Sequence, residues 1–201
     1  MEIVLVRHGR TESLAHSRIR GHELGEWARR YDAAGIDRTL GPPADLQARA
    51  HACGCILASD RRRSIESARW LASDGAIRIE PDLREAGLPD AVPIPLRLPA
   101  AVHLVIARTM WWLNWSRAAE SVDATRDRAD RVSEQLSALA RDVESVIVVG
   151  HGMFNRFIAA RLRKHGWRGP RALPSAYWSA ASFFKSPDHQ SPDHHIHRSE
   201  C

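Results

Sequence analysis

The sequence predicts an α/β protein, a three-layer α/β/α sandwich with a mostly parallel central sheet. Short apolar runs with the composition of strands alternate along the chain with longer segments of helical periodicity. The apolar residues of these runs are consecutive rather than alternating, which is typical of strands that are covered on both faces. We therefore expect helices on both sides of one sheet.

The first quarter of the chain contains one expected strand and two expected helices. The β-branched run at residues 3–6 predicts a buried strand, and the polar residues 7–21 predict a loop that leads into a turn of helix. Apolar residues recur at helical spacing over residues 23–34, which indicates an amphipathic helix. A loop that ends at residues 41–43, Gly-Pro-Pro, precedes a second helix over residues 44–52.

The middle of the chain begins with a second expected strand at residues 55–58. Ser59 and Asp60 follow it, and both are good N-cap residues, so we expect them to cap the next helix. A third, short strand is expected at residues 77–79. Residues 83–99 are rich in proline, which removes a backbone donor and restricts its neighbour, so this segment is expected to be irregular.

The second half of the chain is expected to hold three helices and two strands. Residues 99–115 are apolar and helix-like, and Ser121 is placed to cap a long helix. The β-branched run at residues 146–149 is the clearest strand of the sequence. Residues 153–163 return to helical spacing, and residues 177–184 are expected to form the last strand.

The length of 201 residues predicts one domain, over residues 1–185, followed by a polar, His-rich tail at residues 186–201. The tail has no apolar face, so we expect it to be solvated outside the core rather than to bind metal. No apolar run approaches the roughly 20 residues that cross a bilayer, and the short run before Arg7 is not a signal peptide. With three cysteines, an odd count, the chain is expected in the reducing cytoplasm.

The formal net charge of +5 is compatible with nucleic acid, an anionic surface or an anionic substrate. The basic residues form no long block, and the densest run, Arg61–Arg63, is flanked by Asp60 and Glu66. A nucleic-acid surface would require a broader stripe with interleaved aromatic residues. The charge therefore favours a small phosphorylated partner, with no nucleic acid and no membrane.

Candidate chemical groups follow three of the expected strands. Arg7 and His8 come after the first strand, residues 59–63 after the second, and His151 after the strand at residues 146–149. In open α/β sheets, ligands bind outside the carboxyl ends of the strands. The sequence therefore predicts that these groups meet at one edge of the sheet.

The residue types in these groups suit phosphoryl transfer, which requires a nucleophile, cations around the phosphoryl oxygens and an acid for the leaving oxygen. His8 is the candidate nucleophile, since much of a histidine is neutral at physiological pH. Arg7 and Arg63 can each hold two oxygens through a planar guanidinium. His151 can donate a further hydrogen bond if it is charged, and Glu85 can supply the proton for the leaving group.

The chain resembles the histidine phosphatase superfamily, also known as the phosphoglycerate mutase-like family. Five segments carry the resemblance, in the family's order and in the expected strand contexts: Arg7-His8-Gly9 with Thr11-Glu12, Arg18-Ile19-Arg20-Gly21-His22, Ser59-Asp60-Arg61-Arg62-Arg63, Leu83-Arg84-Glu85 and Gly150-His151-Gly152. The resemblance spans residues 3 to about 160.

The resemblance implies a role for each matching residue. His8 would form a phosphohistidine and Glu85 would be the proton donor. The phosphoryl group would be bound by Arg7, Arg63 and His151, together with Gly152. No metal and no other cofactor would be required, because arginine and histidine supply the positive charge. Neither the residues nor the resemblance assigns an oligomeric state.

Several positions depart from the family's pattern, and they concern the substrate rather than the reaction. Leu14 stands where many members have a phosphate-binding asparagine, and Arg20 replaces a common glutamine. Residues 86–89 lack the Gly-x-Trp-Glu-Gly run of many members. Arg20 is therefore a candidate substrate contact, as is Asn155, which should share a helix face with His151.

The favoured function is a metal-independent phosphomonoesterase. Phosphoglycerate mutase-type transfer is an alternative, although long substrate-closing segments are not evident, and so is hydrolysis of phosphohistidine in a protein. A non-catalytic phospho-ligand binding protein is the alternative from another class, supported by the missing asparagine at Leu14.

Surface and packing roles are expected for several residues near the motifs. Arg61 and Arg62 are expected on the surface. The aromatic residues are expected to pack in the core, with a substrate-selecting aromatic wall as the alternative for the first three: Trp111, Trp112, Trp115, Trp167, Trp178 and Tyr177.

Overall fold

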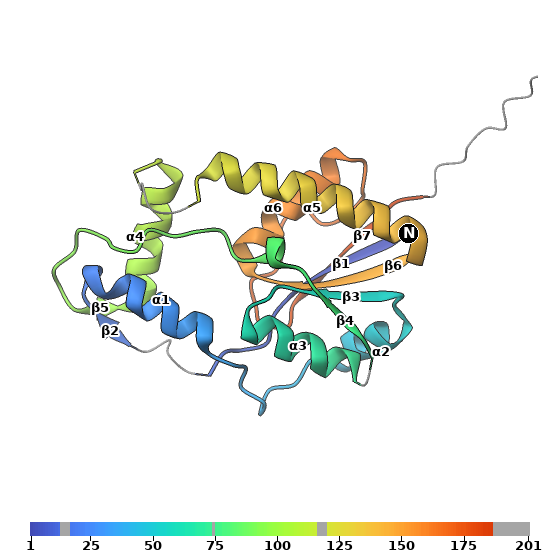
Figure 1. The fold of residues 1–201 in the computed structure, drawn as a ribbon, viewed down its shortest axis with the longest axis horizontal. Helices are drawn as coiled ribbons and strands as arrows, with labels where there is room; N and C mark the ends of the chain where they lie inside the picture. Colours follow the sequence, from blue (N-terminus) through green and yellow to red (C-terminus); the bar gives the residue numbers. More distant parts are fainter. Residues whose placement is uncertain (13–16, 74, 116–119, 187–201) are drawn as a thin grey trace, which may run out of the picture.

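The computed structural model describes residues 1–12, 17–73, 75–115 and 120–186. A five-stranded sheet forms the centre of the fold, in the order β4-β3-β6-β1-β7 (Figure 1). The strands are β1 (Glu2–Arg7), β3 (Cys55–Ala58), β4 (Ile77–Ile79), β6 (Ser145–Gly150) and β7 (Ala180–Phe184). Four run parallel, and β7 pairs antiparallel with β1 at one edge. The predicted mostly parallel sheet is confirmed.

Two helices cover each face of this sheet. One pair is α5 (Val122–Val143) with α6 (Gly152–Lys164), and the other is α2 (Ala44–Ala52) with α3 (Arg62–Ala72). Successive side chains of β1 enter opposite clusters, Leu5 facing α5 and α6 and Val6 facing α2 and α3. The consecutive apolar residues of the strands therefore fill two cores, as expected for a three-layer arrangement.

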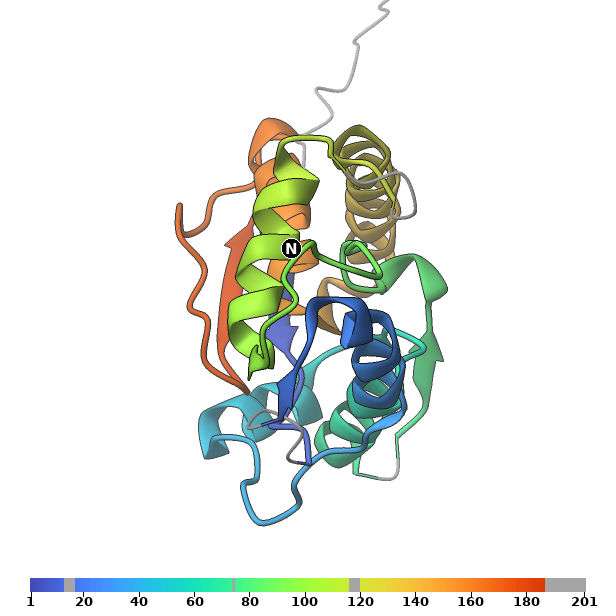
Figure 2. The same ribbon diagram turned by 90° about the vertical axis from the view of Figure 1, so that its left-hand side faces the viewer.

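The remaining elements form a cap at the end of the sheet that lies away from the N-terminus (Figure 1). We define the cap as β2 (Arg18–Ile19), α1 (Leu24–Ala33), β5 (Leu98–Pro99) and α4 (Ala100–Trp112), with the 3-10 turn at Gly21–Glu23. Figure 2 views the molecule from this end and shows α1 and α4 in front of the sheet.

The cap has a hydrophobic cluster of its own, which includes Leu24, Trp27, Val92 and Ala107. Strands β2 and β5 pair antiparallel, which joins two segments that are far apart along the chain. The sequence predicted α1 and α4 but gave no sign of this pairing, since each strand has only two residues.

The helix caps agree with the sequence at one site and not at another. Ser121 caps α5 as predicted, with its Oγ accepting a hydrogen bond from the backbone N–H of Ala124 at 3.1 Å. The prediction for α3 is wrong, because its N-cap is Arg61 and no side chain caps it. Asp60 instead pairs with the guanidinium of Arg84, and Ser59 contacts His151, so both are drawn away by other polar groups.

Among the described residues, no helix is both long and apolar enough to span a membrane. Leu14 and residues 187–201 of the predicted tail lie outside the described part of the chain.

Candidate active site

His8 directly follows β1, and its backbone N–H donates to the Gly150 carbonyl at the end of β6, at 3.0 Å. Its Nδ1 lies 2.7 Å from the Gly9 carbonyl oxygen. Because a carbonyl only accepts, Nδ1 carries the proton, and Nε2 holds the free lone pair. His8 is only 3% exposed, and burial, followed by the charge of Arg63, lowers its pKa to about 3. Its imidazole is therefore neutral at physiological pH.

His151 follows β6 and faces His8 edge to face, with 5.2 Å between the ring centroids. Its Nδ1 lies 3.3 Å from Nη2 of Arg63, which can only donate, so the proton resides on Nε2. That Nε2 lies 3.0 Å from Oγ of Ser59. Burial, and then the charge of Arg63, lowers the pKa of His151 well below its usual value. The predicted charged donor is therefore neutral here, and a bound phosphoryl dianion would raise its pKa again.

Arg63 lies in the first turn of α3 and is 2% exposed. Its Nη1 donates to the Tyr31 carbonyl at 3.2 Å and to Oδ1 of Asp32 at 3.0 Å. Its guanidinium also lies over the ring of Tyr31, 4.8 Å from the centroid. Nε is buried and, among the described residues, has no hydrogen-bond partner. A buried cation with an unused donor is suited to an anion.

Arg7, at the end of β1, repeats this arrangement. Its Nη1 donates to the Ser175 carbonyl, and its guanidinium lies 4.3 Å from the ring centroid of Tyr177. Its Nε is also buried without a partner among the described residues. A Cβ added to Gly152 would lie 3.6 Å from this Nε, so the first turn of α6 packs closely against Arg7.

Glu85 is held at the N-terminus of α6, next to His151. Its Oε1 accepts from the backbone N–H of Phe154 at 2.7 Å and from that of Ala86 at 2.9 Å. Its Oε2 accepts from the N–H of Met153 at 3.1 Å. The N–H groups of Met153 and Phe154 are among those that a helix leaves without internal partners at its N-terminus. The predicted acid is thus anchored beside the second histidine, although it belongs to a loop.

Two arginines fix the loop that carries Glu85. Arg128 of α5 donates to the Arg84 carbonyl at 2.9 Å, and Arg108 of α4 donates to the Gly87 carbonyl at 3.1 Å. The cap and the helical layer therefore hold the two sides of the loop.

Some site residues were not found from the sequence. Oγ of Ser67 accepts from the Gly9 N–H at 2.8 Å and donates to the Arg63 carbonyl at 2.6 Å, which ties the His8 loop to α3. Tyr177, expected only to pack, has its ring 5.7 Å from that of His8. Tyr31 and Asp32 enter the site from the cap. The only available signal was the helical spacing of Ser67 four residues after Arg63.

Arg20 and Asn155, the two predicted substrate contacts, do not lie with the two histidines in the same way: one is on the surface of the cap and the other is buried below the strand end. Arg20 is exposed in the cap, where its backbone N–H donates to Glu23 at 2.6 Å, and no described contact joins it to the histidines. Asn155 is 3% exposed, and its Nδ2 donates to the Val6 carbonyl at 3.1 Å. A Cβ added to Gly150 would lie 2.6 Å from Oδ1 of Asn155. Asn155 therefore supports the strand end beneath His8.

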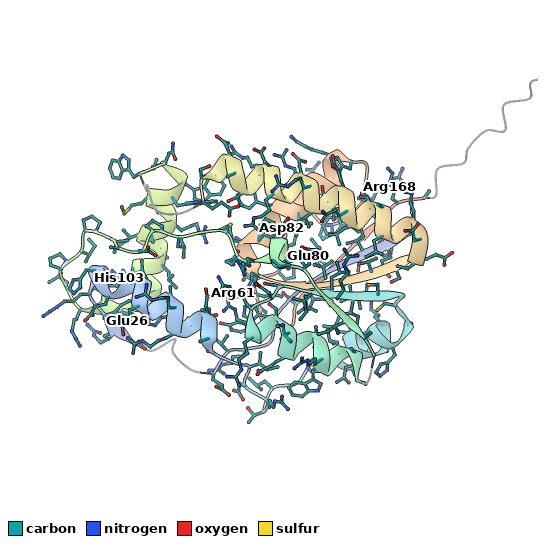
Figure 3. The ribbon with its side chains drawn as sticks, viewed as in Figure 1. Glu26, Arg61, Glu80, Asp82, His103 and Arg168 are labelled. Atoms are coloured by element: carbon teal, nitrogen blue, oxygen red, sulfur yellow. The ribbon has the colours of Figure 1, made fainter. Side chains whose placement is uncertain are left out.

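The surface predictions hold for Arg62, which is exposed and pairs with Glu66. Arg61 is half-buried instead and donates to Oδ2 of Asp32 at 3.1 Å, because Asp32 draws it toward the site. Figure 3 shows it between α1 and α3.

The prediction of core packing is confirmed for Trp111, which is buried against Phe157, and for Trp167 and Trp178, which are also buried. It is wrong for Trp115, which is 74% exposed, and Trp112 is only partly covered by its stacking on Phe157. The described ring contacts of these tryptophans do not include the two histidines. Within the described residues, no group of three or more His, Cys, Asp or Glu side chains is arranged to hold a metal ion.

The sequence matches one family model over nearly its whole length. The model is that of the histidine phosphatase superfamily (branch 1), and it matches residues 3–185. None of the proteins with curated descriptions matches the sequence.

Solved structures share the fold at low sequence identity. The product of the open reading frame Rv3214 of Mycobacterium tuberculosis is 20% identical, with 90% of this chain and 89% of that chain covered and a TM-score of 0.60. A phosphoserine phosphatase from Entamoeba histolytica, solved as a mutant with phosphoserine, is 14% identical, with 91% and 90% covered and a TM-score of 0.57. The alpha-ribazole phosphatase of Shigella flexneri is 20% identical, with 81% and 79% covered and a TM-score of 0.53.

Proposed function

Because the chain belongs to the histidine phosphatase superfamily, branch 1, we propose that it hydrolyses a small phosphomonoester through a phosphohistidine on Nε2 of His8. The observation that carries the proposal is the state of His8. Its Nδ1 is committed to the Gly9 carbonyl, and its pKa is lowered to about 3. A neutral imidazole with its Nε2 lone pair free is the form that can attack phosphorus.

The first step forms the bond between Nε2 of His8 and phosphorus and breaks the bond from phosphorus to the ester oxygen. Glu85, in its protonated form, gives its proton to that oxygen, so the leaving group departs as an alcohol. Arg7 and Arg63 neutralise the charge on the other phosphoryl oxygens. The unpartnered, buried Nε of each arginine supports this role, since each provides a donor without breaking an existing bond.

The second step returns the protein to its starting form. Water attacks phosphorus while the Glu85 carboxylate takes its proton, and the bond from Nε2 to phosphorus breaks. Inorganic phosphate leaves and His8 is neutral again. In this scheme the two arginines supply the positive charge and His151 supplies a further hydrogen bond, which supports a reaction that does not depend on a metal.

The proposal is tested with an aryl phosphate and a matched pair of variants. We expect His8→Ala to lower turnover by about a thousandfold or more, whereas His22→Ala, which changes an exposed histidine of the cap, should leave it unchanged. A rapid quench of the wild type should trap an acid-labile, base-stable phosphoryl label. Equal turnover in His8→Ala and wild type would exclude the covalent mechanism.

One observation favours a non-catalytic phospho-ligand protein as the second candidate. Both oxygens of Glu85 already accept backbone N–H groups, which ties the carboxyl to its loop and to α6 rather than leaving it free to meet a leaving group. Binding of inorganic phosphate without any turnover across a panel of phosphorylated metabolites would support this candidate. Transfer of the label to a second alcohol instead of water would indicate a mutase.

A further inference from the structure

The two phosphate-binding arginines are held in the same way. In each, Nη1 donates to a backbone carbonyl, that of Ser175 for Arg7 and that of Tyr31 for Arg63. In each, Nε is buried and has no partner among the described residues. The Nε–H of both guanidinium groups is therefore left free.

Each guanidinium also lies on the face of a tyrosine. Arg7 lies 4.3 Å from the ring centroid of Tyr177, and Arg63 lies 4.8 Å from that of Tyr31. Both distances are within the range of favourable cation–π contacts. Stacking restrains the plane of a guanidinium but uses none of its N–H groups, so Nε remains available for an anion.

The two tyrosines are joined to each other. The hydroxyl of Tyr31 is hydrogen-bonded with the hydroxyls of Thr11 and Tyr177, and burial raises the pKa of Tyr31, so the hydroxyl keeps its proton and can donate. The ring of Tyr31 also stacks on Trp27 of the cap, 5.2 Å away and nearly parallel. Tyr177 comes from the segment before β7. The pair thus connects the cap to the edge of the sheet.

We propose that Tyr31 and Tyr177 form a tyrosine platform that positions Arg7 and Arg63, so that their free Nε–H groups face a dianionic phosphoryl group bound beside His8 and His151. Both tyrosines are positioning residues, since they act through the arginines. The inference rests on the proposed function for the identity of the anion. It adds that the cap contributes to phosphate affinity through Tyr31, and therefore that the phosphate subsite is shared between the cap and the sheet.

The test measures the affinity of the full chain for inorganic phosphate by titration calorimetry. We expect Tyr177→Leu and Tyr31→Leu each to weaken binding by about three- to tenfold, and the Phe variants, which keep the stacking, to restore most of the affinity. Trp112→Leu removes a partly exposed aromatic residue of α4 and should change nothing. Unchanged phosphate affinity in both Leu variants would overturn the proposal.

A double-mutant cycle separates positioning from a general structural effect. Lysine lacks the planar guanidinium, so in an Arg7→Lys background the further change Tyr177→Leu should have almost no additional effect on phosphate affinity. An additive loss would mean that Tyr177 does not act through Arg7 and would contradict the proposal. If a Leu variant fails to fold, the same cycle is run with Tyr177→Met or Tyr31→Met, which keep the bulk of the side chain without an aromatic face.

Phosphate binding and ester turnover test the tyrosine platform and the proposed function separately. If the wild type binds phosphate without hydrolysing any ester, the proposed function is wrong, and the Leu variants still decide the platform. If the wild type hydrolyses esters but the Leu variants bind phosphate as tightly as it does, only the platform is wrong. If the wild type does not bind phosphate at all, the platform is also wrong.

Discussion

The strand ends and the cap contribute to the candidate site in different ways. At the strand ends, the backbone places the residues: His8 donates to the Gly150 carbonyl at 3.0 Å, and Ser59 donates to the Val149 carbonyl at 3.1 Å. The cap reaches the site chiefly through the side chains of Tyr31 and Asp32, together with the Tyr31 carbonyl that accepts from Arg63. Backbone ladders tolerate little change, whereas side-chain contacts can be exchanged residue by residue. Under the proposed function, this difference would place the reaction at the strand ends and leave the side-chain contacts of the cap to vary with the substrate.

Glu85 belongs to a loop between the strand ends and the cap, and its replacement is expected to have a large effect on activity. If its carboxyl takes part in the chemistry, Glu85→Gln should lower kcat by about 10²- to 10⁴-fold. The loss should be largest for esters with poor leaving groups, since these depend most on protonation of the leaving oxygen. The measurement is kcat across a series of aryl and alkyl phosphates.

The matched control for Glu85 is Glu26→Gln, an exposed carboxylate on the outer part of α1 (Figure 3). It should leave kcat unchanged for every ester. A uniform loss across leaving groups in Glu85→Gln would argue against an acid role and would place Glu85 with the residues that only support the site.

The second prediction tests whether the cap is a separately packed region. Leu24 is 1% exposed in the cap's own hydrophobic cluster. Leu24→Ala should lower the stability of the packed cap by about 2–4 kcal/mol. The sheet should be affected much less. Hydrogen exchange should therefore accelerate in α1 and α4, while the amides of β1 and β6 keep their protection.

Leu136→Ala is the comparison for Leu24, because it opens a similar cavity in the cluster between α5 and the sheet. It should reduce protection throughout the sheet. If Leu24→Ala accelerates exchange in β1 and β6 as much as in α1, then the cap and the sheet unfold as one unit, and the cap is not a separately packed region.

The elements whose signal is local could be predicted from the sequence. The apolar runs and helical spacing marked the five strands of the central sheet and the six α-helices in the described part of the chain, with small shifts at their ends. The sequence also predicted that His8 and His151 lie at one edge of the sheet, because parallel strands place their carboxyl ends together, but it did not predict the strand order. Each of these signals lies within about ten neighbouring residues.

The features that were missed depend on contacts between distant segments. Tyr31 and Tyr177 meet only because the cap folds over the edge of the sheet, and nothing near either residue in the sequence indicates the other. Ser59 was expected to cap α3, but a buried histidine offered it a stronger partner. In both cases tertiary contacts override the local preference of the residue.

The smallest expected effect concerns the protonation of the buried histidines. The pKa of His8 is about 3 in the folded protein and about 6.5 in an unfolded chain. Above pH 6.5 both states are neutral, and the stability is fully present. Between pH 6.5 and 3 the unfolded chain binds a proton that folded His8 does not, so the free energy of unfolding falls as the pH falls.

The cap supplies the control for this effect, because His22 is exposed there. Urea unfolding at pH 7.5 and 5.5 should show that His8→Gln loses about 1.4 kcal/mol less than the wild type over this range. His22→Gln should lose as much as the wild type. His151, whose pKa is also lowered by burial, should behave like His8. Equal losses in His8→Gln and wild type would mean that His8 is protonated in the folded state, and the strand end would then hold no neutral nucleophile.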